Sequence, residues 1–186
     1  MSEKSFKVSF TLDEADAAYF RGLFKKARKS ASEEDPETIL KAANELVETV
    51  RKSKKTPNFV LEAIETLEDL TQLIEDKDWK ASKAVVNQVV GALAYFAHAE
   101  DLIPDHIPVL GFLDDAIMIK FVEDEFRHEI RGFRKFRKFR AGAEQRPWTV
   151  VARDRLPGRL EAQRAKLRAE IDRKQKSDAD KGRVGF

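Results

Sequence analysis

The sequence contains no cysteine among its 186 residues, and it contains only 8 glycines and 6 prolines. The absence of cysteine excludes a disulfide scaffold, a thiolate zinc site and cysteine catalysis. The chain also lacks the Ser-His-Asp order, the nucleophile elbow and the P-loop that support common enzyme classes. We therefore expect a protein that is not an enzyme and that needs no cofactor, unless one acidic segment binds a divalent metal ion.

Neither the N-terminus nor the longest uncharged run has the composition of a membrane segment. Residues 1–7 hold no apolar stretch typical of a signal peptide, which predicts a cytoplasmic protein, free or at the periphery of a membrane. The uncharged run at 84–99 contains Asn87, Gln88 and His98. It is shorter than the ~20 apolar residues that a transmembrane helix needs, so we expect it inside a helical bundle.

Apolar residues recur at helical spacing along most of the chain. The pattern predicts an all-α fold, a helical bundle of about five to six helices with a proline-broken helical hairpin and a basic C-terminal helical extension. The expected helices cover about residues 11–27, 35–50, 56–74, 78–97, 112–140 and 158–174. A capping box of Thr11 and Glu14 is expected to start the first helix, and a turn at Pro157-Gly158 to precede the last. Only Phe6–Phe10 alternates, as an edge strand or an extended arm would.

The net charge of +2 results from two halves of opposite sign. Residues 1–126 carry 16 basic and 25 acidic side chains, net −9, and residues 127–186 carry 19 basic and 8 acidic ones, net +11. We therefore divide the chain into a helical bundle at 1–140 and a charged extension with one helix at 141–186.

The expected helix at 158–174 has only a narrow apolar stripe, formed by Leu160, Leu167 and Ile171. So thin a stripe favours docking on a partner protein, or on a second copy of this chain, over filling a core.

The most distinctive segment is 95–116, where two Ile-Pro pairs precede a glycine and paired aspartates. The residues that carry the pattern are Tyr95, Asp101, Pro104, Asp105, Pro108, Gly111, Asp114 and Asp115. Through them, the chain at about 85–122 resembles the YkvA-like family, a bacterial domain of unknown function. The resemblance implies a helical hairpin bent around a proline loop, and it implies no particular activity.

Four carboxylates of this segment lie close together along the chain, on Asp101, Asp105, Asp114 and Asp115. Magnesium and calcium prefer oxygen ligands of this kind, which suggests a metal-dependent enzyme or a metal-regulated protein. The favoured alternative is structural, because aspartates accept amide hydrogen bonds in loops and suit the positive end of a helix beginning near Gly111. The spacing is not that of an EF-hand.

Basic residues and phenylalanines interleave at 131–140, with six basic side chains and three phenylalanines in ten positions. At about 100° per residue, Phe126, Phe133 and Phe136 fall on one side of a helix and most cations on another. The candidate anion-binding residues are Arg127, Arg131, Arg134, Lys135, Arg137, Lys138 and Arg140.

Three interpretations of this arm compete. The helix can lie in an anionic membrane surface with its phenylalanines inward, or its cations can contact nucleic-acid phosphates. Alternatively, the phenylalanines pack on the protein's own helices while the cations stay solvated or pair with the acidic half. We expect a non-enzymatic binding or scaffolding protein whose basic arm engages an anionic partner. Nucleic acid or ribonucleoprotein is favoured slightly over an anionic membrane.

Overall fold

The computed structural model describes residue 11 and residues 13–31, 34–53, 56–98, 111–145 and 150–182. These residues form seven helices and no strand, which confirms the all-α prediction. The helices are α1 (Glu14–Ser30), α2 (Pro36–Lys52), α3 (Asn58–Glu75), α4 (Lys83–Leu93), α5 (Tyr95–His98), α6 (Leu113–Glu144) and α7 (Val150–Asp180). The strand or arm expected at 6–10 lies outside the described residues.

Local capping chemistry decides where the helices begin. Asp13 caps α1, because its carboxylate accepts from the amides of Ala15 and Asp16, and the Asp16 carboxylate accepts from the Asp13 amide in return. The capping box predicted from Thr11 is therefore wrong by two positions, since a carboxylate suits the positive helix end better than a hydroxyl. The helix expected at 78–97 begins later, at α4, after its cap Ser82, and it is interrupted between α4 and α5.

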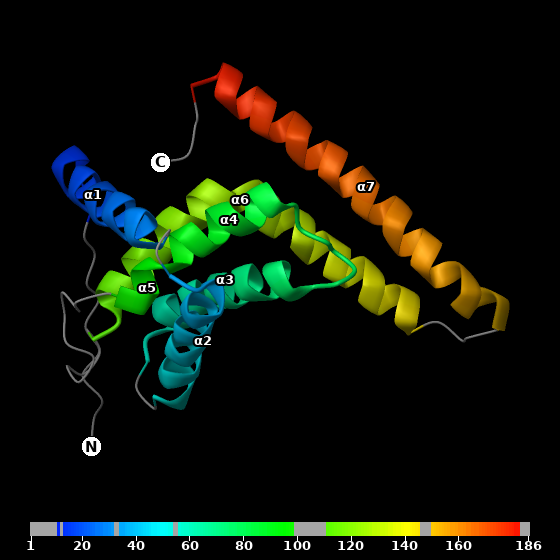
Figure 1. The fold of residues 1–186 in the computed structure, drawn as a ribbon, viewed down its shortest axis with the longest axis horizontal. Helices are drawn as coiled ribbons and strands as arrows, with labels where there is room; N and C mark the ends of the chain where they lie inside the picture. Colours follow the sequence, from blue (N-terminus) through cyan, green and yellow to red (C-terminus); the bar gives the residue numbers. More distant parts are fainter. Residues whose placement is uncertain are drawn as a thin grey trace, which may run out of the picture.

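Apolar side chains form two buried clusters along α6, which runs through the centre of the molecule (Figure 1). The larger cluster joins the first half of α6 to α1–α5. The smaller cluster, which we call the Trp79 cluster, joins the second half of α6 to the end of α3 and to α7. Its buried members are Leu73, Trp79, Phe133, Phe136, Leu160, Leu167 and Ile171.

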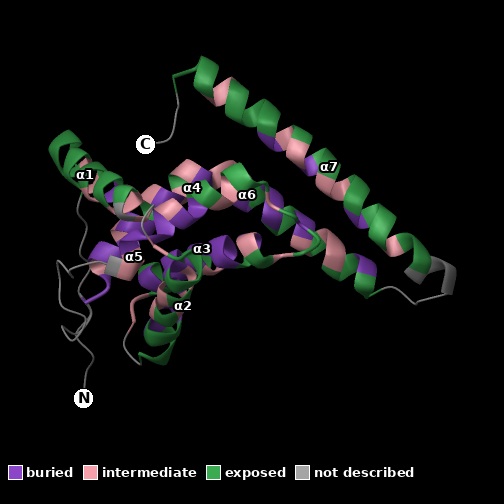
Figure 2. Ribbon diagram, viewed as in Figure 1, coloured by how far each residue is buried: buried purple, intermediate pink, exposed green. Residues whose placement is uncertain are grey.

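Helix α7 runs alongside α6 and buries only a narrow stripe against it (Figure 2). This stripe consists of Leu160, Leu167 and Ile171, the side chains for which partner docking was predicted. In the structure these three residues belong to the chain's own core, so the reason given for partner docking does not hold for them. Contacts of the exposed sides of α7 with a partner protein or a second copy stay a prediction.

The turn predicted at Pro157-Gly158 is wrong, because both residues lie inside α7. A proline within a helix removes one backbone hydrogen bond, but it does not have to end the helix. Here Leu156 packs against the Trp79 cluster and anchors the turn before the proline. Helix α6 also continues past the predicted boundary at residue 140, to Glu144.

None of the helices in the described part of the chain is both long enough and apolar enough to cross a bilayer. This agrees with the expectation that the run at 84–99 is part of the bundle, since Val89, Val90 and Leu93 are buried in the larger cluster.

Candidate anion-binding surface

On one side of α6, arginines of the basic segment 131–140 form ion pairs with α3 and with the turn that follows it. Asp69, a buried residue of α3, accepts hydrogen bonds from both Arg134 and Arg137. Arg140 pairs with Asp76 at 2.6 Å and with Asp78 at 3.0 Å. These three arginines therefore neutralise carboxylates of the acidic half and hold α6 on α3.

The turn after α3 is organised around the Asp76 carboxylate. Burial disfavours the charged form, but hydrogen bonds from Arg140 and from the Trp79 amide outweigh it and lower the pKa of Asp76. The same carboxylate accepts from the amides of Asp78 and Trp79, at 2.9 and 2.8 Å. Arg140 thus secures the turn that places Trp79 in the core, which is a structural role.

A second side of α6 is tied to α7. Asp178 lies 2.5 Å from Arg127 and 2.7 Å from His128 Nε2. Arg127 and then His128 lower the pKa of the Asp178 carboxyl to about 2. Further along, the buried Glu129 accepts from Arg168 at 2.8 Å. Burial raises the pKa of Glu129 in spite of this guanidinium.

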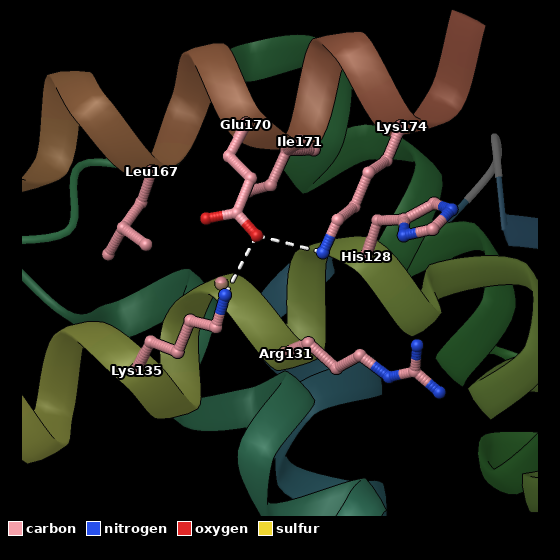
Figure 3. A pocket seen from close by; sticks show the side chains of 8 residues that line it. His128, Arg131, Lys135, Leu167, Glu170, Ile171 and Lys174 are labelled. Carbon is pink, nitrogen blue, oxygen red and sulfur yellow. Dashed lines mark hydrogen bonds and ion pairs between the residues drawn. The ribbon is translucent and has the colours of Figure 1, made fainter. Parts of the chain in front are cut away.

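A groove lies between α6 and α7, next to these ion pairs (Figure 3). It is lined by His128, Arg131, Gly132, Lys135, Leu167, Glu170, Ile171 and Lys174. Lys135 of α6 and Lys174 of α7 reach the same oxygen of Glu170, at 2.7 and 2.8 Å. Hydrogen bonds from Lys135 and then Lys174 lower the pKa of the Glu170 carboxyl to about 2.

Exposed cations lie in this groove or about one helical turn from a residue that lines it. The Arg131 guanidinium points away from Glu170 in Figure 3. Arg131, Lys138, Lys166 and Arg173 are exposed, and none forms an ion pair within the described residues. We call the surface that they form with their neighbours the α6–α7 basic face. It comprises Arg131, Lys135, Lys138, Arg159, Lys166, Arg173 and Lys174.

Helical spacing places these residues in two rows. On α6, Arg131 and Lys138 flank Lys135 at positions −4 and +3, which are neighbouring positions on one helix face. On α7, Lys166 and Arg173 flank Glu170 in the same way. The groove residues Lys135 and Glu170 thus lie at the middle of the two rows.

Of the seven anion-binding candidates predicted from the sequence, five have carboxylate partners within the chain, Arg127, Arg134, Lys135, Arg137 and Arg140. The structure leaves Arg131 and Lys138 exposed, and it adds the row on α7, which sequence reasoning missed. The seven-residue spacing of Arg159, Lys166 and Arg173 is the signal that could have revealed that row.

The phenylalanines of the basic segment face the interior. Phe126, Phe133 and Phe136 are buried, and the rings of the last two pack at a tilt against Trp79, with centroid distances of 5.7 and 5.3 Å. Arg159 of α7 covers the ring of Phe139, with its guanidinium 5.7 Å from the centroid. Self-packing of the phenylalanines, one of the three interpretations, is what the structure shows.

Part of the acidic segment, 111–116, lies within the described residues. Asp114 and Asp115 are buried in the first turn of α6, where the positive end of the helix favours carboxylates. Tyr95 and Gly111 are also buried. The remaining pattern residues, Asp101, Pro104, Asp105 and Pro108, lie outside the described residues. Within the described ranges no group of three or more His, Asp or Glu side chains is arranged to hold a metal ion, so metal binding stays a prediction.

Acid is expected to weaken the docking of α7 on α6 between pH values of about 4.5 and 2. Both Glu170 and Asp178 have pKa values lowered to about 2, from ordinary values of 4.5 and 3.8. Carboxyls with lowered pKa values stabilise the docked state above their ordinary values, and this stabilisation is lost as the pH falls toward 2. The raised pKa of Glu129 has the opposite sign, so protonation of that carboxyl favours the folded state and blunts the acid transition.

The fluorescence of Trp79, followed from pH 6 to pH 2 in a Trp148→Phe background, measures this loss of docking. A Glu170→Gln/Asp178→Asn variant is the control. Its signal should change less than the parent's over the same range, and the change that remains should come from carboxyls such as Asp76, whose pKa is also lowered. An identical acid transition in the parent and in this variant would contradict the assignment.

Comparison with known families gave one match. Residues 88–121 match the family model described as protein of unknown function, DUF1232. The match falls within the range 85–122 and confirms the predicted resemblance, since the YkvA-like family is consistent with it. It covers under a fifth of the chain, from Gln88 of α4 to Phe121 of α6. Comparisons with curated proteins and with solved structures gave no match.

Proposed function

We propose that this protein is a non-enzymatic binding protein whose α6–α7 basic face contacts the phosphate backbone of a nucleic acid. The observation that carries the proposal is the exposure of Arg131, Lys138, Lys166 and Arg173 in two neighbouring rows while other arginines of α6 are paired. Cations that the fold leaves unpaired remain available to phosphates.

The shape of the face fits a linear polyanion. The row from Arg159 to Arg173 spans about 21 Å at a rise of 1.5 Å per residue. One strand of a duplex carries a phosphate about every 3.4 Å, so the length of the row corresponds to about six phosphates. Arginine and lysine in such a row offer donors along the whole length of a backbone.

The positions of the aromatic side chains favour phosphate contacts over two other modes of binding, insertion into a membrane and stacking on unpaired bases. An amphipathic helix binds a membrane by inserting its apolar face, but Phe126, Phe133 and Phe136 are occupied in the core. The same burial removes them as stacking platforms for unpaired bases. We therefore expect binding that depends on salt and little on base sequence, with duplex RNA or DNA as a sufficient ligand.

Fluorescence anisotropy with a fluorescein-labelled 20-base-pair RNA duplex, over a range of salt concentrations, tests the proposal. A Lys138→Ala/Lys166→Ala variant removes one lysine from each row. Each phosphate-contacting lysine that is lost should weaken binding for all sequences and reduce the salt slope by about 1. A DNA duplex of the same length should give a similar slope.

The matched control is Lys25→Ala/Lys83→Ala, which removes two exposed lysines from α1 and α4. This variant has the same net charge, and it should retain the parent's affinity and salt slope. Equal losses in the two double variants, or no salt-dependent binding by the parent protein, would refute the proposal. Binding to phosphatidylserine vesicles without binding to either duplex would identify the membrane alternative instead.

A further inference from the structure

We propose that the groove around Glu170 is a binding site for a single phosphate group, and that the Glu170 carboxylate occupies it as an internal competitor. This inference rests on the proposed function, because the phosphate is taken to be one of those along the bound nucleic acid. It adds a specific subsite and a residue that sets the affinity of the whole face.

The contacts of Glu170 are those expected of a bound anion. Lys135 and Lys174 come from different helices, and both ammonium groups are directed at one carboxylate oxygen (Figure 3). A lysine ammonium is a point charge with three donors, and it binds phosphate as readily as carboxylate. Two such groups held by rigid helices therefore form a site that accepts either anion.

The internal carboxylate is exchangeable. Lys135, Lys174 and Glu170 keep 53%, 45% and 28% of their side-chain surfaces exposed, so water reaches all three. Ion pairs in such surroundings are weak, because solvent screens them and long side chains lose freedom when they are held. A phosphate that is already held by neighbouring cations can displace a carboxylate attached to a flexible side chain.

The position of the groove supports the same conclusion. Lys135 and Glu170 lie between free cations at positions −4 and +3 on each helix, so a backbone that follows the rows crosses the groove. Arg131 lines the groove as well, and its guanidinium is not engaged by Glu170. A phosphate at the centre would thus have Lys135 and Lys174 beside it, with Arg131 at the edge of the groove.

The test compares Glu170→Gln with Asp172→Asn, using the same 20-base-pair RNA duplex. Both substitutions remove one negative charge from a side chain of α7 that water reaches. Asp172 lies two residues beyond Glu170 and so about 200° around the helix, away from the groove. It forms no ion pair with any described residue, so its replacement breaks no contact of that kind.

Glu170→Gln should gain one phosphate contact. Its salt slope should steepen by about 0.9, and its affinity at 0.1 M salt should rise about eightfold. Asp172→Asn should change neither quantity comparably. Adding Lys135→Ala and Lys174→Ala to Glu170→Gln should abolish the gain, and far-ultraviolet circular dichroism should show that all variants keep the parent's helix content.

The outcomes separate this inference from the function on which it rests. Equal effects of Glu170→Gln and Asp172→Asn would overturn the phosphate site, while salt-dependent binding by the parent protein would still support the basic face. A gain in Glu170→Gln that survives the loss of both lysines would also overturn it. Failure of the parent and of Glu170→Gln to bind the duplex would overturn both proposals.

Discussion

Replacing Trp79 with alanine is expected to lower the free energy of unfolding by about 3–5 kcal/mol, the usual cost of removing a large aromatic side chain from a core. Trp79 is fully buried and is in contact with elements from three parts of the chain. Its ring lies beside Phe133 and Phe136 of α6, and the Arg168 guanidinium of α7 lies 4.2 Å from its centroid. The loss should therefore fall most heavily on the docking of α7.

Urea denaturation followed by circular dichroism measures the overall loss, and hydrogen exchange of α7 amides measures its docking. Phe59→Ala is the control, because Phe59 of α3 is also a large aromatic residue but is 45% exposed. Surface substitutions of this kind usually change stability by about 0.5 kcal/mol or less. Similar destabilisation by the two variants, or unchanged protection of α7 in Trp79→Ala, would show that Trp79 does not hold the helix.

The dependence of α7 on so small a cluster follows from its sequence. Among the residues of this helix whose burial is described, Leu160, Leu167 and Ile171 are the buried ones, and polar contacts complete the interface. Arg168 reaches Glu129, and Arg164 donates to the backbone carbonyl of Asp78 at 2.9 Å. Arg164, which lies between Leu160 and Leu167 at the helical spacing of the apolar stripe, is therefore part of the same docking interface.

The helices of the acidic half could be predicted because their signals are local. Proline at the start of α2, with Asp35 before it, fixes that helix within a residue of the predicted start. Apolar residues at helical spacing then identify the buried faces of α2 and α3, as Val47, Leu67 and Leu70 show. Such patterns need no knowledge of what lies on the other side of the interface.

The ion-pair partners of the cations on α6 could not be predicted in this way. Arg134 and Asp69 are 65 residues apart, and Arg127 and Asp178 are 51 residues apart. No spacing rule connects residues at such separations, so helical projection groups all the cations of α6 without showing which are neutralised. The division of charge at residue 126 did indicate that the basic half could pair with the acidic half. The ion pairs of Arg134, Arg137 and Arg140 with carboxylates of α3 and the turn after it are such contacts.

The narrow stripe of α7 shows a second limit of sequence reasoning. Three apolar residues are too few to identify a core helix by periodicity, because an exposed helix that awaits a partner has the same pattern. The missing part of the interface is supplied by Trp79 and by the phenylalanines of α6, which lie in other segments of the sequence. Only the fold brings these contributions together.

Gly132→Val is expected to destabilise the protein by about 1–3 kcal/mol through overpacking at the contact between α6 and α7. A Cβ atom at residue 132 would lie 2.6 Å from Ile171 Cδ1 and 3.1 Å from Ile171 Cγ1. Ile171 is itself buried, so its side chain has little room to withdraw. The absence of a side chain at Gly132 is thus what allows α7 to approach α6.

Gly142→Val is the matched control, because it makes the same change on the same helix where no atom lies within 4 Å of a Cβ. Valine has a higher helix propensity than glycine, so this variant should be as stable as the parent or slightly more stable. Ile171→Val removes the Cδ1 atom and should recover part of the stability lost in Gly132→Val. Additive effects of these two substitutions would contradict a direct contact.

The same glycine connects packing to the proposed function. Displacing α7 from α6 would separate Lys135 from Glu170 and Lys174, and it would move the row of Lys166 and Arg173 away from that of Arg131 and Lys138. If one nucleic acid contacts both rows, Gly132→Val should weaken duplex binding while Gly142→Val leaves it unchanged. Undiminished binding by a Gly132→Val protein whose α7 amides exchange rapidly would mean that a single row is sufficient.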